Sequence, residues 1–342
     1  MQMQWYTDLA IEETISLLAI DSPTGDTAEA ESHLLARFES LSVSARRLCK
    51  GGVLADLGGE GEGILLMAHT DTLGAMVAEI KENGRLRVSP LNGLEANNSE
   101  TENVRIRTRD GRTYEGTLQL CNASVHVNDD YKKCERTFST LEVVIDMPTS
   151  SAAETEALGI RTGDFVCPEP RTRVTESGYV KSRFLDDKLS VGILLSLASR
   201  IRETAPNRHI YMLITAFEEV GHGASFMVPG DVKELLCVDM GCVGDGLSCT
   251  EHTVSICPKD SHGPYSKEVV DALVAAAEAS GARYALDIYP HYGSDAGAAV
   301  AAGNDVRFGL IGPGVYASHG YERSHRDGVE NTLKLLFAYL GL

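Results

Sequence analysis

Histidine and carboxylate side chains stand at the boundaries of apolar runs in this sequence. The segments with this arrangement are His69-Thr70-Asp71, Asp186-Asp187, Glu218-Glu219, Asp239 and His319. Imidazole and carboxylate groups are ligands that zinc and related divalent cations take in enzymes. One such segment occurs easily by chance, but their joint occurrence in one chain indicates a metal-dependent enzyme.

The set has the composition that a two-metal hydrolase needs. Two divalent cations about 3.5–4 Å apart require one carboxylate between them, with a histidine and a further carboxylate for each. One carboxylate beside a ligand is then left to take and return a proton. Asp71, two residues from His69, could orient the imidazole. No Gly-x-Ser-x-Gly motif indicates a nucleophilic serine, and Cys242 and Cys257 have no indicated histidine partner.

Alternating strand and helix patterns surround these segments. Apolar runs typical of buried strands span residues 64–68, 209–217, 235–240 and 306–311. Helical spacing of apolar residues spans 8–20, 28–41, 186–201, 266–280 and 329–340. This alternation predicts an α/β fold with a doubly wound mixed sheet and helices on both faces. Functional groups gather beyond the carboxyl ends of strands in such sheets, where these segments stand.

The pattern differs between about residues 74 and 180. Short β-rich runs at 85–88, 104–108, 113–118, 141–145 and 171–175 alternate with turn sequences, without a long helical pattern. We therefore expect an inserted β-barrel-like domain over residues 74–180. The catalytic domain would be discontinuous and comprise residues 1–73 and 181–342.

Composition excludes some partners. The 342 residues include 31 Lys and Arg against 49 Asp and Glu, a formal charge of −18 at pH 7. This charge argues against nucleic acid or an anionic membrane surface as partner. The sequence has no signal-peptide pattern and no apolar run of about 18 residues, so we expect a cytoplasmic protein. The eight cysteines lack Cys-x-x-Cys spacing and are expected to be free thiols.

Taken together, the motifs resemble those of the glutamyl aminopeptidase family. These are cytosolic dinuclear metallo-aminopeptidases that form tetrahedral dodecamers and have endoglucanase-annotated homologues. The similarity covers most of the chain. The motifs that carry it are Ala68-His69-Thr70-Asp71-Thr72-Leu73-Gly74, Val144-Ile145-Asp146, Leu158-Gly159-Ile160-Arg161-Thr162-Gly163-Asp164, Phe184-Leu185-Asp186-Asp187-Lys188-Leu189, Ala216-Phe217-Glu218-Glu219-Val220-Gly221, Val238-Asp239 and Gly293-Ser294-Asp295-Ala296-Gly297.

The resemblance implies a role for each site residue. The implied metal ligands are His69, Asp186, Glu219, Asp239 and His319. Asp186 would bridge two divalent ions, zinc or cobalt, and each ion would take one histidine and one further carboxylate. Glu218 would be general base and acid toward a metal-bridging water, and Asp71 would orient His69.

The implied activity is removal of N-terminal residues from short peptides by a homo-oligomer, with the dodecamer as the family's form. The inserted domain would shape assembly and substrate access. Spacing separates this family from carboxypeptidases and amidohydrolases with similar motifs, whose extra domain precedes the last histidine. Here the gap between His69 and Asp186 has room for a domain, whereas strand, helix and strand fill the gap between Asp239 and His319.

The sequence departs from the family pattern near two motifs. Only His222 separates Gly221 from the next Gly-Ala pair, where the family usually has two residues. Gly320, rather than Ser, follows His319, and His325 is a rival ligand. We favour His319 because it is nearer the end of the strand, whereas His325 approaches the last helix.

Other functions share part of this evidence. The ending Tyr321-Glu322-Arg323 resembles a divergent branch that accompanies enzymes of a dipeptide-type osmolyte pathway. A metal-dependent amidohydrolase or deacylase acting on a modified dipeptide would use the same ligands. A catalytically inactive scaffold homologue is a third hypothesis. A glycosidase would need two carboxylates without metal, which leaves the histidines unexplained.

Overall fold

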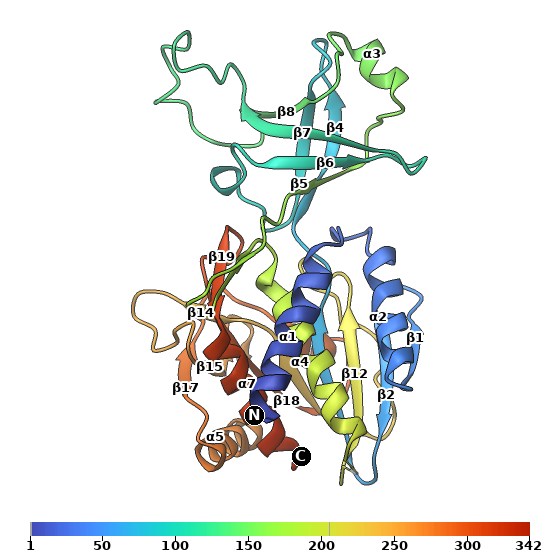
Figure 1. Ribbon diagram of the computed structural model, residues 1–342, viewed down its shortest axis with the longest axis vertical. Coiled ribbons are helices and arrows are strands. Elements are labelled where there is room, and N and C mark those ends of the chain that lie inside the picture. The colour runs from blue at the N-terminus through green and yellow to red at the C-terminus, as the bar shows by residue number, and fades with distance from the viewer. Residues whose placement is uncertain (1, 205) are drawn as a thin grey trace. The chain divides into compact units, whose positions relative to one another are not determined.

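The chain forms two compact units. The computed structural model describes residues 2–204 and 206–342. The larger unit comprises the residues up to Thr72 together with Arg171–Leu342, and the smaller unit comprises Leu73–Pro170. Both chain termini belong to the larger unit (Figure 1).

Parallel strands form the centre of the larger unit's thirteen-stranded sheet. In spatial order they are β12 (His209–Thr215), β3 (Gly63–His69), β13 (Val232–Val238) and β18 (Arg307–Tyr316). Every residue of β3 is buried, as its uninterrupted apolar sequence predicts for a strand covered on both faces. The four apolar runs are thus confirmed as strands, although β18 extends five residues beyond the predicted end.

Antiparallel strands make the sheet mixed. On the β12 side they are β1 (Ser44–Arg47) and β2 (Val53–Gly58), and on the β18 side β19 (Glu322–His325), β11 (Tyr179–Ser182) and β10 (Arg173–Val174). Further strands connected through β18 are β14 (Gly241–Val243), β15 (Val254–Asp260), β16 (Gly263–Pro264) and β17 (Tyr284–Ile288). The run at 171–175, expected in the inserted domain, instead joins the larger unit because β10 pairs with β11, and β11 with β19.

Helices cover the sheet of the larger unit. They are α1 (Gln2–Leu18), α2 (Ala28–Ser40), α4 (Leu185–Arg202), α5 (Lys267–Ser280), α6 (Asp295–Ala301) and α7 (Arg326–Leu340). Leu65 and Met67 of β3 share a core cluster with Ala296 of α6, while α4 lies in front of the sheet beside α1 (Figure 1). The predicted doubly wound α/β fold is confirmed. Among these six helices of the larger unit, the seven-residue α6 was not predicted from the sequence.

The smaller unit contains a closed barrel. Its strands, in barrel order, are β4 (Gly74–Ile80), β5 (Leu86–Leu91), β8 (Leu141–Ile145), β7 (Thr113–Leu120), β6 (Asn103–Arg107) and β9 (Phe165–Pro168). Alternate residues of β7 are buried, as expected when one strand face lines a barrel interior. The short helices η1 (Ala96–Asn98) and α3 (Ala152–Ala157) complete the unit.

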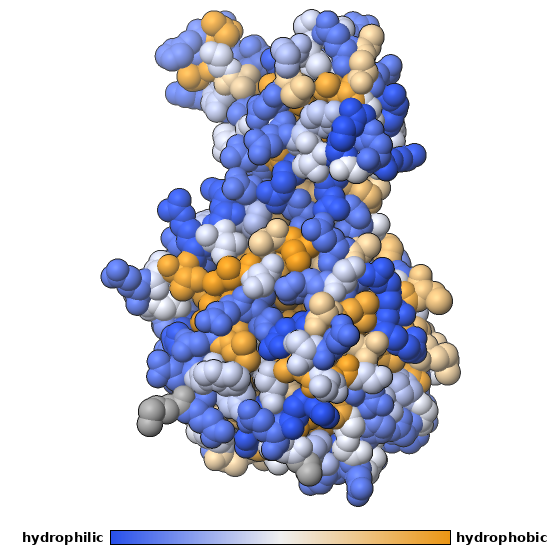
Figure 2. All heavy atoms as spheres, turned by 45° about the vertical axis from the view of Figure 1, so that its right-hand side comes forward, coloured by the Kyte–Doolittle hydropathy of each residue, from blue (hydrophilic) through white to orange (hydrophobic). Residues whose placement is uncertain are grey.

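Hydrophilic side chains dominate the face drawn in Figure 2, but apolar side chains reach the surface of the larger unit in several places. Exposed apolar residues of this unit include Trp5, Met227 and Ile288. Among the helices of the described residues, none is both long and apolar enough to span a bilayer.

Candidate metal centre

The parallel register brings most of the predicted site residues to one edge of the sheet. His69, the last residue of β3, pairs with Thr215, the last residue of β12. Glu218 follows β12, and Asp239 directly follows β13. Because the carboxyl ends of parallel strands lie on the same edge, chain segments far apart in sequence meet there.

The predicted ligands fall into two groups, and within each group the donor atoms lie within 4.8 Å of one another. One group contains His69, Asp186 and Asp239, and the other contains Asp186, Glu219 and His319. Asp186 belongs to both: its Oδ1 is 3.2 Å from His69 Nε2, and its Oδ2 is 3.6 Å from His319 Nε2. Two imidazole–carboxylate sets joined by one shared carboxylate fit a pair of divalent cations.

Glu218 lies beside these groups without belonging to either. Its Oε2 is 3.7 Å from His69 Nε2, and its side chain is 15% exposed. Burial raises the pKa of Glu218 well above its ordinary value, His69 opposes this, and the charge of Asp239 adds to it. A carboxyl group with a raised pKa and access to solvent can both accept and donate a proton.

Negative charge accumulates in the centre. Burial, followed by the charge of Asp186, raises the pKa of Glu219 well above its ordinary value and that of Asp239 to about 7. Burial disfavours protonation of His69, but Glu218 and neighbouring aspartates outweigh it and raise the His69 pKa. Buried carboxylates this close need protons or cations to offset their repulsion. The electrostatics of the donor set therefore also fit cations.

Asp71 contacts His69 and also the backbone of the Glu218–Glu219 pair. His69 Nδ1 is 3.0 Å from the Asp71 main-chain oxygen and 3.6 Å from its carboxylate. The carboxylate accepts the backbone N–H groups of Glu218 at 3.1 Å and Glu219 at 3.4 Å, and the Thr24 hydroxyl at 2.7 Å. Asp71 thus supports the backbone of the glutamate pair as well as His69.

Two further buried aspartates hold the backbone around the centre. Asp187 Oδ2 accepts the N–H of His69 at 3.2 Å. Asp295 accepts the Thr215 hydroxyl and, at 2.7 Å, the N–H of Ala224, so it contacts both ends of the loop that carries the glutamate pair. The sequence motifs contained both aspartates, but their spacing alone gave them no role.

Glu322 is a third buried carboxylate, and no sequence signal marked it as a site residue. It accepts the N–H groups of Asp186 and His319, each at 3.0 Å. Burial and then the charge of Asp186 raise its pKa well above the ordinary value, against the effect of these amides. Its position three residues after His319 is the available hint in the sequence.

His325 lies in a different group, with His252 and Asp327. Its Nδ1 accepts the N–H of Asp327 at 3.0 Å, so the imidazole caps α7. Arg283 donates to the Asp327 carboxylate at 2.6 Å. An occupied lone pair, a helix N-terminus and a guanidinium all disfavour a cation, so this group is a capping network. His319, rather than His325, lies with the site carboxylates.

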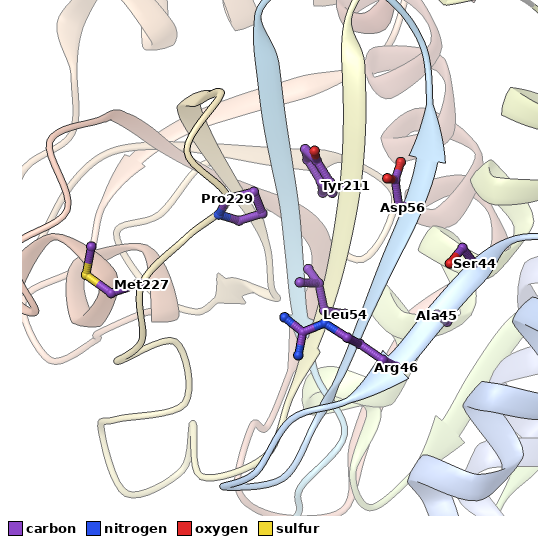
Figure 3. A pocket seen from close by; sticks show the side chains of 8 residues that line it. All are labelled: Ser44, Ala45, Arg46, Leu54, Asp56, Tyr211, Met227 and Pro229. Carbon is purple, nitrogen blue, oxygen red and sulfur yellow. The ribbon is translucent and has the colours of Figure 1, made fainter.

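A pocket of about 380 Å³ elsewhere in the larger unit contains none of the predicted site residues. Figure 3 shows its lining side chains, which are Ser44, Ala45, Arg46, Leu54, Asp56, Tyr211, Met227 and Pro229. His209 already pairs with Asp56 at 2.9 Å and with Asp231 at 2.7 Å. The lining of this pocket therefore lacks a converging set of histidines and carboxylates like that of the candidate metal centre.

Comparison with known proteins agrees with the geometry. Residues 51–335 match the family model of the M42 glutamyl aminopeptidases. The aminopeptidase YhfE of Bacillus subtilis (strain 168) is 44% identical over 330 residues, 95% of both chains. An aminopeptidase from Desulfurococcus kamchatkensis has a similar fold, with 23% identity, a TM-score of 0.87, and coverage of 98% of this chain and 95% of that one. The TET1 peptidase of Pyrococcus horikoshii has a TM-score of 0.85 and 20% identity, with 97% and 99% coverage.

Proposed function

The chain belongs to the M42 glutamyl aminopeptidase family, and from this membership we propose that it is a dinuclear metallo-aminopeptidase that acts on short peptides. The family is one of metal-dependent hydrolases of peptide bonds. The observation that carries the dinuclear proposal is the pair of ligand groups that share Asp186.

In this proposal Asp186 bridges two ions, and each ion is also bound by one histidine and one further carboxylate. His69 and Asp239 would hold one ion, and Glu219 and His319 the other. The bound ions would polarise the scissile carbonyl and lower the pKa of a water molecule. Mixed nitrogen and oxygen donors favour zinc or cobalt over magnesium or calcium.

Glu218 would transfer the proton of the reaction. Its carboxylate is beside His69 without belonging to a ligand group, and its exposed fraction leaves it open to a water molecule. It would accept a proton from the attacking water and deliver it to the leaving amine. Asp71 would keep Glu218 in place through the backbone N–H that it accepts.

Membership of an aminopeptidase family favours a substrate with a free N-terminus. An aminopeptidase releases the residue that carries the free α-amino group. An acylated peptide lacks that free amine. We therefore propose short peptides with a free amine as substrates, in preference to modified dipeptides.

We also propose that the protein is a homo-oligomer, with a dodecamer as the first assembly to test. The TET1 peptidase of Pyrococcus horikoshii can assemble into a tetrahedron or a large octahedral shell. The exposed apolar side chains of the larger unit, such as Ile288, would be available for subunit contacts.

The test combines metal replacement with one substitution. Wild-type protein is stripped of metal, reloaded with Zn²⁺ or Co²⁺, and assayed with dipeptides and tripeptides in free-amine and N-acetylated forms. We expect hydrolysis of free-amine peptides only after reloading. Glu218→Gln should retain both ions and lose about 10²–10⁴-fold in kcat. Faster hydrolysis of the acetylated peptides would instead support the deacylase hypothesis, and unchanged turnover by Glu218→Gln would refute its role.

A further inference from the structure

One buried carboxylate connects two separate chain segments of the candidate centre. Glu322 begins β19 and is 2% exposed. Its Oε2 accepts the backbone N–H of Asp186 at 3.0 Å, and its Oε1 accepts that of His319 at 3.0 Å. The side chain therefore joins the start of α4 to the turn after β18, although the two lie far apart in sequence.

The start of α4 receives a hydrogen-bond acceptor from Glu322. Phe184, the residue before the helix, has a left-handed φ of +68° and makes no side-chain capping bond. Asp186 (φ −75°, ψ 103°) and Asp187 (φ −119°, ψ 22°) have non-helical backbone angles, so the regular helix does not fix the backbone of Asp186. Glu322 supplies an acceptor for the Asp186 N–H from another strand, at the residue whose carboxylate is shared by the two ligand groups.

The turn that carries His319 has an unusual backbone conformation. His319 has a φ of +62°, a region that side chains with a Cβ atom rarely adopt. The Gly320 N–H bonds to the Ala317 carbonyl at 3.0 Å, and Glu322 accepts the N–H of His319 itself. Conformations of this kind persist where the surroundings hold them, so loss of the Glu322 contact would let the imidazole move.

We propose that Glu322 is a positioning residue that fixes Asp186 relative to His319 and thereby controls the affinity of the metal position that these two side chains share. The inference rests on the proposed function, in which both bind one ion. Glu322 belongs to neither ligand group, so it acts through the backbone of two ligands. A carboxylate is needed because each of its two oxygens faces an N–H donor.

The geometry defines two informative variants and a control. Glu322→Gln keeps the shape but turns an NH₂ group toward one of the two donors. Glu322→Asp keeps the charge but is one methylene shorter, so it can reach only one donor well. Glu234→Gln is the matched control: Glu234 is also buried in the larger unit, where it accepts bonds from Arg208 and Tyr339.

Each full-length protein is stripped of metal and titrated with Co²⁺, followed by calorimetry and by visible absorption, which reports the coordination geometry. We expect one of the two binding steps to weaken by about 10–100-fold in Glu322→Gln, with an altered spectrum. Glu322→Asp should change in the same direction, and kcat should fall more than KM changes. Glu234→Gln should keep both affinities within twofold, even if its melting temperature falls.

The outcomes separate the inference from the proposed function. Wild-type affinities and spectra in Glu322→Asp, or in a folded Glu322→Gln, would overturn the positioning role while leaving the dinuclear proposal intact. Fewer than two Co²⁺ ions per wild-type chain would contradict the dinuclear proposal itself, and the wild type alone decides this. An equal loss of affinity in Glu234→Gln would make the effect one of general stability and would also overturn the inference.

Discussion

Asp71 Oδ1 accepts the backbone N–H of Glu218 at 3.1 Å, so the last residue of the His-x-Asp motif holds the proposed base as well as supporting the histidine. Two motifs that are 147 residues apart therefore share one carboxylate. This relationship changes what substitution of Asp71 should do.

Asp71→Asn should impair catalysis more than metal binding. The asparagine side chain still offers an oxygen, but its NH₂ group replaces an oxygen that accepts a bond from the Glu218–Glu219 backbone. We expect kcat to fall by about 10–100-fold while the chain retains metal. Steady-state kinetics together with elemental analysis would check this. Thr24→Val, which removes only the hydroxyl donor to Asp71, should have a much smaller effect, and equal losses would contradict this account.

Asp186 and Asp239 should differ in how many ions depend on them. Asp186 belongs to both ligand groups, whereas Asp239 belongs to one. Asp186→Asn is therefore expected to weaken the binding of both ions. Asp239→Asn should weaken mainly the binding of one ion. Mass spectrometry under native conditions would count the ions bound to each variant. The same count for both variants would argue against Asp186 as the bridge.

His319 and His325 should give opposite phenotypes. His319→Ala removes an imidazole that lies with the site carboxylates, so metal affinity and activity should fall without a large change in stability. His325→Ala removes the cap of α7, so the free energy of unfolding should fall by about 1 kcal/mol. Thermal unfolding and metal titration of both variants would test this. Loss of one ion in His325→Ala alone would reverse the assignment.

Glu142 should make the stability of the smaller unit depend on pH. Burial would raise the pKa of this carboxyl, but hydrogen bonds from Lys81 and Arg85 outweigh it and leave the pKa lowered. A group with a lowered folded-state pKa stabilises above its unfolded value of about 4.3, and the contribution is lost as the pH falls through the folded-state pKa. Glu142→Gln should thus cost about 1–2 kcal/mol at pH 7 and progressively less below about pH 4.

Denaturant unfolding at pH 7 and below about pH 4, followed by circular dichroism, would measure the free energy of unfolding that Glu142→Gln costs at each pH. Glu79→Gln is a suitable control because Glu79 pairs with Arg87 at 2.8 Å on the exposed side of the same barrel. Its cost should stay below about 1 kcal/mol. A Glu142→Gln difference that is independent of pH would contradict the titration of Glu142.

The sequence was sufficient to predict the residues that meet at the sheet edge, because buried parallel strands have a clear apolar pattern and end where the polar motifs begin. It predicted the α/β fold for the same reason, and it predicted the barrel because short β-rich runs alternate with turn sequences there, without a long helical pattern. Glu322 could not be recognised, since β19 has only four residues and its burial depends on pairing with β11. The dual role of Asp71 was also out of reach, because the backbone amides that it accepts come from a distant loop.

The smaller unit is inserted between His69 and every other candidate ligand in the sequence. During synthesis, β3 therefore leaves the ribosome before the barrel strands, and the barrel can close while the candidate metal centre still lacks most of its side chains. His319 is made after every other candidate ligand. A nascent chain therefore lacks a complete candidate metal centre until His319 has been added, long after the barrel sequence has been made.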